Sequence, residues 1–113
     1  MRIGIPKEIK IDENRVGLVP ASVRELVHHG HSVLVEAGAG LGIGIADEDY
    51  RRAGAGVAAG ADEVFAGADL IVKVKEPQPA EIARLSARHT LFTYLHLAPA
   101  PAHPIVTAYR ESF

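Results

Sequence analysis

Short apolar runs alternate with amphipathic stretches along most of the chain, and this alternation predicts strands separated by helices. Strands are predicted at residues 2–6, 31–36, 69–75 and 90–96, with a very short one at 56–59. A helix is predicted to begin at Pro20, with Val23, Leu26 and Val27 on one face and Gly30 ending it. Shorter helices are predicted after an N-cap at Asp47, at residues 61–66 and after Pro79.

Strands separated by helices in this way favour right-handed crossovers and a largely parallel sheet. We therefore predict a layered α/β fold of the Rossmann-like or flavodoxin-like kind, with helices on both faces of the sheet. With 113 residues, the chain has room for a single core. We expect one domain over residues 1–98 and a divergent tail over 99–113, because the proline-rich APAPAHP at 98–104 cannot form a regular helix.

Composition narrows the class of protein. Apolar residues make up 48% and charged residues 23% of the chain, which argues against disorder. The net charge of -2 gives no electrostatic reason to expect nucleic acid or an anionic membrane as partner. The absence of cysteine excludes disulfides, thiolate metal sites and cysteine nucleophiles. No apolar run approaches the ~20 residues of a membrane span and no secretory signal is recognisable, so a cytoplasmic protein is expected.

Ligands of open parallel α/β sheets bind beyond the carboxyl ends of the strands, where loops converge. The loop leaving the first strand carries the charged residues Lys7, Glu8, Lys10, Asp12, Glu13 and Arg15. In residues 69–75, the two-residue period of a strand places Lys73 and Lys75 on one face with Ile71. The strand at 90–96 ends in His96. One arginine, one or two lysines and one histidine are thus expected at the same rim.

Such a group of side chains suits a small 2-oxo or 2-amino acid. The arginine fork binds a carboxylate bidentately, a lysine ammonium polarises an oxo group, and a histidine transfers protons near neutral pH. The alternative is that Arg15 is a solvated loop residue and that the strand-end lysines extend to water.

Three other patterns have the letters of a dinucleotide or metal site, but their context indicates turns and close packing. Gly54–Ala59 has the letters of a dinucleotide fingerprint but follows a helical segment instead of a strand. The glycines at 38, 40, 42 and 44 follow a strand without forming GxGxxG. His28, His29 and His31 are interrupted by Gly30, so no metal site is predicted there.

Three blocks resemble the start of bacterial alanine dehydrogenases, from residue 1 to about 98. They are MRIGIPKEIKIDENRVGLVPASVRELVHHGHSVLVEAGAG at 1–40, DLIVKVKEP at 69–77 and LFTYLHLA at 91–98. The same domain type opens the α subunit of proton-translocating NAD(P) transhydrogenases. Those relatives differ around the positions of Lys75 and His96, so the match favours alanine dehydrogenase.

The resemblance implies a role for each residue of the rim. Arg15 binds the carboxylate of pyruvate or alanine, and Lys75 contacts the carboxylate or the oxo group. His96 is the acid–base residue in the NAD-dependent oxidative deamination of L-alanine to pyruvate and ammonia. Glu8, Lys73 and Tyr94 are further candidates for lining the pocket.

The family pattern continues beyond what this sequence contains. In the family, an NAD-binding Rossmann domain follows, and later segments complete the first domain. We therefore expect a truncated member with an incomplete fold that supplies the substrate half only, and that forms homo-oligomers or associates with a nucleotide-binding domain. The alternatives are a non-catalytic remnant or partner module that binds small carboxylates, and a domain of the transhydrogenase type.

Overall fold

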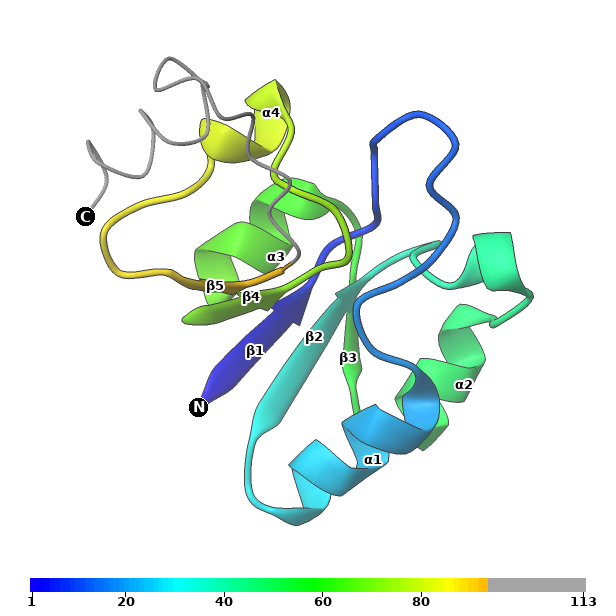
Figure 1. The fold of residues 1–113 in the computed structure, drawn as a ribbon. Helices are drawn as coiled ribbons and strands as arrows, with labels where there is room; N and C mark the ends of the chain where they lie inside the picture. The colour runs from blue at the N-terminus through cyan, green and yellow to red at the C-terminus, as the bar shows by residue number, and fades with distance from the viewer. Residues whose placement is uncertain (94–113) are drawn as a thin grey trace.

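The computed structural model describes residues 1–93, which form one parallel sheet with helices packed on it (Figure 1). The strands are β1 (Arg2–Ile5), β2 (Ser32–Glu36), β3 (Gly56–Ala58), β4 (Leu70–Val72) and β5 (Thr90–Phe92). The helices are α1 (Pro20–His28), α2 (Asp47–Arg52), α3 (Ala61–Gly67) and α4 (Pro79–Ile82), with a 3₁₀ turn η1 at Leu41–Ile43. The predicted domain boundary near residue 98 lies outside the described residues.

Every strand pair in the described residues is parallel, as predicted, and the order across the sheet is β3-β2-β1-β4-β5. The central strand β1 pairs on one side with β2, where Ile3 faces Val33, and on the other with β4, where Ile3 faces Leu70. The chain therefore first extends the sheet outward from β1 through β2 to β3, and then returns to the opposite side of β1. This reversal of direction creates a topological switch point between the carboxyl ends of β1 and β4.

Helices cover both faces of the sheet, which confirms the predicted layering (Figure 1). On the face of α1 and α2, a core forms from branched strand residues and helix residues that include Ile5, Val23, Val35 and Tyr50. On the other face, α3 packs Phe65 against Ile71 of β4. Residues 3–5 of β1 and 71–72 of β4 are buried without alternation, as expected for parallel strands whose sheet is covered on both faces.

Two sequence predictions about element ends were wrong. Ala46 and not Asp47 is the N-cap of α2, and the Ala46 N–H donates to the Asp49 carboxylate at 3.1 Å. The Asp47 carboxylate accepts the backbone N–H of Gly38 at 2.8 Å, so it fixes the preceding glycine loop. The strand predicted at 69–75 ends at Val72.

The early end of β4 has a direct cause. The amide groups of Val74 and Lys75 turn away from the sheet and donate to the carboxylate of Glu8, at 2.9 and 3.1 Å. A two-residue alternation therefore does not carry through to Lys75, and the prediction that Lys73 and Lys75 share one strand face was wrong.

Among residues 1–93, no helix has the length and apolar character needed to cross a membrane.

Candidate functional site

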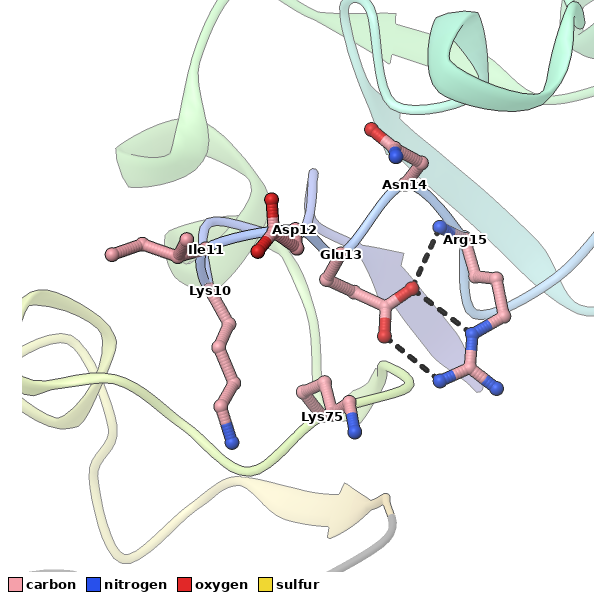
Figure 2. Close-up of a pocket in the computed structure, with 7 residues that line it drawn as sticks. All are labelled: Lys10, Ile11, Asp12, Glu13, Asn14, Arg15 and Lys75. Atoms are coloured by element: carbon pink, nitrogen blue, oxygen red, sulfur yellow. Dashed lines mark hydrogen bonds and ion pairs between the residues drawn. The ribbon is translucent and has the colours of Figure 1, made fainter.

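A cavity of about 450 Å³ opens at the switch point, between the loop that follows β1 and the segment that follows β4 (Figure 2). It is lined by Lys10, Ile11, Asp12, Glu13, Asn14, Arg15 and Lys75. A smaller cavity of about 30 Å³ shares Glu13, Asn14 and Arg15 with it and extends toward Gly38 and Gly42. Arg15 and Lys75, predicted from their strand-end positions, thus line the same cavity.

The loop after β1 turns sharply at Asp12. The N–H of Glu13 donates to the carbonyl of Lys10 at 3.1 Å, and Asp12 lies in the left-handed region with φ of 65°. Aspartate tolerates this conformation better than most residues, because its short polar side chain interacts with the local backbone. After the turn, Glu13 and Arg15 line the cavity together with Lys75, which follows β4.

Two glycines let other backbone segments approach this loop closely. A Cβ on Gly17 would lie 2.5 Å from the carbonyl oxygen of Val72, at the end of β4. A Cβ on Gly42 would lie 2.8 Å from the carbonyl oxygen of Asn14. The loop is therefore held between the end of β4 and the turn η1, and the expectation that the glycines near 42 serve close packing is confirmed for Gly42.

A buried tyrosine fixes the far end of the same loop. Tyr50 of α2 is fully buried, and its hydroxyl donates to the carbonyl of Leu18 at 2.7 Å. Burial, with a smaller contribution from the nearby Asp47 charge, raises the pKa of Tyr50 to about 12. The neutral hydroxyl is thus preserved as a hydrogen-bond donor.

Tyr50→Phe is expected to lower the free energy of unfolding by about 1–3 kcal/mol, because the Leu18 carbonyl loses its partner. In the parent chain, unfolded Tyr50 ionises near pH 10 while the folded residue stays neutral up to about 12. Stability is therefore lost as pH rises through this range, and Tyr50→Phe removes that part of the loss. Urea denaturation of both proteins near neutral pH and between pH 10 and 12 measures the effect. If the free energies of unfolding of the two proteins changed with pH in parallel between pH 10 and 12, this prediction would be contradicted.

Arg15 is paired within its own loop. Its Nε and Nη2 donate to the two oxygens of Glu13 at 3.0 and 2.8 Å, and its backbone N–H donates to the same carboxylate at 2.8 Å (Figure 2). These hydrogen bonds, opposed by partial burial and supported by the charges of Arg15 and Lys75, lower the pKa of Glu13 to about 2. Glu13 is thus a carboxylate throughout the physiological range, and it raises the pKa of Arg15 in turn.

Lys75 has a fixed backbone and a free ammonium group. Its N–H is held by Glu8, and its carbonyl accepts bonds from the ammonium of Lys73 at 2.8 Å and the hydroxyl of Thr93 at 2.9 Å. Its own Nζ extends into the cavity and has no hydrogen bond or ion pair with another residue of 1–93 (Figure 2). A preorganised backbone carrying a free cation suits an anionic or carbonyl ligand.

Lys73 supports this segment from beneath. Its ammonium is buried and lies 2.8 Å from Glu8 Oε1 and 3.4 Å from Glu81 Oε1. Burial, countered in part by the Gln78 N–H and by Lys73, raises the pKa of Glu81. Lys73, expected as a pocket residue, is among the lining residues of neither cavity. Glu8 borders the smaller cavity, but both its oxygens are occupied by Lys73, Val74 and Lys75.

The sequence reasoning missed Lys10 and Glu13 as lining residues. Lys10 forms an ion pair with Glu76, whose carboxyl is buried. Burial alone would raise the pKa of Glu76, but the Lys10 ammonium and backbone hydrogen bonding outweigh it and lower this pKa. The charge-rich KEIKIDENR segment was the available signal, but only the turn at Asp12 shows which of its side chains face the cavity.

His96 and Tyr94 lie outside the described residues. Thr93, which follows β5, donates its hydroxyl to the Lys75 carbonyl at 2.9 Å.

The described residues do not fit a dinucleotide. In a Rossmann half, a glycine-rich turn joins the first strand directly to a helix N-terminus, whereas here a long charged loop intervenes between β1 and α1. The fingerprint-like Gly54 has φ of 102° and packs on Val27 at the turn from α2 into β3, as expected for a packing glycine. Among residues 1–93, no cluster of histidine and carboxylate side chains could hold a metal ion.

Comparison with known proteins agrees with this geometry. The alanine dehydrogenase from Halomonas elongata is 56% identical over 98 residues, which are 87% of this chain and 26% of that protein. The alanine dehydrogenase from Mycobacterium tuberculosis H37Rv is 53% identical over 102 residues, 90% of this chain and 28% of that protein. The chain thus spans about a quarter of the length of the curated relatives it matches.

Solved structures show the same relationship. A structure of L-alanine dehydrogenase superposes with a TM-score of 0.92 at 48% identity, covering 99% of this chain and 30% of that one. A transhydrogenase from Sinorhizobium meliloti gives a TM-score of 0.77 at 38% identity, covering 82% of this chain and 26% of that one. The model of the alanine dehydrogenase/PNT N-terminal domain family matches residues 4–112. This chain belongs to that family.

Proposed function

We propose that this chain supplies the substrate-binding half of an NAD-dependent alanine dehydrogenase, which converts L-alanine reversibly to pyruvate and ammonia. The observation that carries the proposal is the meeting of Arg15 and Lys75 at one cavity, from the loops after two adjacent parallel strands. Both cations lie at the switch point, where α/β sheets bind their ligands.

The proposed roles follow from the chemistry of these groups. The Arg15 guanidinium binds the substrate carboxylate, because its planar fork matches the two carboxylate oxygens. The Lys75 ammonium, which lines the same cavity, contacts the carboxylate or the oxo oxygen of pyruvate. His96 transfers a proton to or from the reacting oxygen or nitrogen of the substrate, in line with the family resemblance. Glu8 and Lys73 act indirectly by fixing the Lys75 backbone, and Tyr94 is a further candidate for lining the pocket.

Hydride transfer requires NAD, which accepts the hydride in this class of reaction. Because residues 1–93 do not fit that cofactor, we assign its binding to a nucleotide-binding domain with which this chain associates. Homo-oligomer formation and a cytoplasmic location belong to the same proposal.

A second candidate function is a carboxylate-binding module without catalysis. Arg15 and Lys75 give the cavity two cations that suit a carboxylate, whereas the described residues offer no dinucleotide site. This combination favours a binding module as the alternative function. A transhydrogenase-type role is less well supported, since the transhydrogenase structure is 38% identical over the matched region and the L-alanine dehydrogenase structure is 48% identical.

Pyruvate titration of the ¹⁵N-labelled chain tests the binding site. Arg15→Gln and Lys75→Gln are each expected to weaken pyruvate binding by about 10- to 100-fold, the range for losing one charge-assisted interaction. Arg51→Gln removes an exposed cation on α2 and is the matched control, expected to leave the affinity unchanged. Equal affinities for the parent chain and Arg15→Gln would contradict the proposed site.

A mixing experiment distinguishes the proposed enzyme function from the proposed binding-module function. The purified chain, L-alanine and NAD are combined with a separately produced nucleotide-binding domain of an alanine dehydrogenase, and NADH absorbance is followed. Turnover that needs both proteins and is lost with Arg15→Gln supports the enzyme. Pyruvate binding without turnover under any mixing condition supports the module.

A further inference from the structure

Glu13 and Arg15 differ in how firmly each is held. The Glu13 side chain is only 5% exposed, whereas that of Arg15 is 64% exposed. A long exposed arginine side chain is ordinarily free to sample many rotamers. Here its guanidinium is tied to a nearly buried carboxylate two residues earlier, so the glutamate is the fixed partner and the arginine is the group that it orients.

The contacts leave a specific edge of the guanidinium open. Glu13 accepts from Nε and Nη2, which form one side of the planar group. The opposite end, formed by Nη1 and the second hydrogen of Nη2, makes no hydrogen bond within residues 1–93. Figure 2 shows this end directed away from Glu13, with the Lys75 ammonium on the same side of the cavity. A bidentate carboxylate needs two parallel N–H groups of this kind.

We propose that Glu13 is a positioning residue that holds Arg15 by its Nε–Nη2 edge and presents the Nη1–Nη2 edge to the substrate carboxylate. This inference rests on the proposed function, in which Arg15 binds that carboxylate. Glu13 stays in place while the ligand is bound, so the guanidinium bridges two carboxylates, one from the protein and one from the substrate.

Two effects of Glu13 on affinity oppose each other. Its negative charge repels a ligand carboxylate, and this repulsion is weakened by solvent at an exposed site. Its hydrogen bonds remove the need to immobilise Arg15 on binding, which otherwise weakens binding by about 2- to 10-fold for a flexible side chain. The second effect dominates in this inference, because the bonds from Arg15 to Glu13 are short and include its backbone N–H.

The test combines affinity with a direct signal from the Arg15 side chain. In the ¹⁵N-labelled chain, the Arg15 Nε–H resonance is expected to exchange slowly with water and to persist when pyruvate saturates the site. Glu13→Gln is expected to bring that exchange close to the rate of free arginine and to weaken pyruvate binding by about 2- to 10-fold.

Glu63→Gln is the matched control for charge. It removes the carboxylate of an exposed α3 residue that lines neither cavity and makes no contact with the Arg15 bonds. It is expected to leave pyruvate affinity unchanged or slightly higher and the Nε–H exchange unaltered.

Several results would overturn the inference. They are rapid Nε–H exchange in the parent chain, loss of the Nε–H signal on saturation with pyruvate, and Glu13→Gln affinity equal to or tighter than that of the parent. Binding that Arg15→Gln abolishes and Glu13→Gln leaves intact overturns this inference alone. Failure of the parent chain to bind pyruvate, or equal binding by Arg15→Gln, overturns the proposed function as well.

Discussion

Lys73→Met is expected to lower the free energy of unfolding by about 3–5 kcal/mol, the usual result of removing one partner from a buried charge cluster. The Lys73 ammonium lies between the carboxylates of Glu8 and Glu81, and all three side chains are almost completely buried. Methionine fills a similar volume but leaves two carboxylates facing each other without a cation. Urea denaturation followed by circular dichroism measures the loss, which is a large share of the ~5–15 kcal/mol typical of a domain.

Two variants show whether charge is the cause. Lys75→Met removes a neighbouring lysine whose ammonium lies in the open cavity, so it is expected to change stability by less than about 0.5 kcal/mol while weakening pyruvate binding. Glu81→Gln leaves the Lys73–Glu8 pair matched. Since burial raises the pKa of Glu81, folding favours its neutral form more than the unfolded chain does, and the neutral amide is expected to cost less than Lys73→Met. Equal losses for Lys73→Met and Lys75→Met would exclude the buried cluster as the source.

The layered fold was predictable because its signals are local. Alternating apolar runs mark the strands, and Pro20 and Gly30 bracket α1. Parallel pairing follows from the helices between the strands. The order of the strands was not predictable in this way, because the return from β3 to the far side of β1 depends on which sheet edge each helix can cover.

The site was predictable in part for a related reason. Strand ends of a parallel sheet share one edge, so Arg15 and Lys75 were expected together, and they line one cavity. The sequence could not show that Lys73 is buried while Lys75 lines the cavity. This difference depends on Glu8, which is distant in sequence and whose hydrogen bonds to Val74 and Lys75 end the strand after Val72. A two-residue sequence period within one strand contains no information about a carboxylate contributed by another loop.

One small residue, Gly17, allows the loop to approach β4 closely. Gly17 carries no charge and belongs to no recognised motif, yet its Cα lies directly against the backbone of Val72 and Lys73. Such close approach is a tertiary property, and it brings the loop that carries Arg15 up to the end of β4. The cavity thus depends as much on the absence of a side chain at residue 17 as on the cations that line it.

Gly17→Ala is therefore expected to separate the loop from β4, with a loss of about 1–3 kcal/mol in the free energy of unfolding and weaker pyruvate binding. The new Cβ would lie 2.5 Å from the carbonyl oxygen and 2.9 Å from the carbonyl carbon of Val72, and a strand backbone cannot rotate aside as a side chain can. Gly60→Ala is the matched control: no atom lies within 4 Å of its added Cβ, and the loss there is expected to stay below about 1 kcal/mol. Denaturation and pyruvate titration of both variants measure the difference. Parent-like affinity in Gly17→Ala would show that the spacing between Arg15 and Lys75 is set elsewhere in the chain.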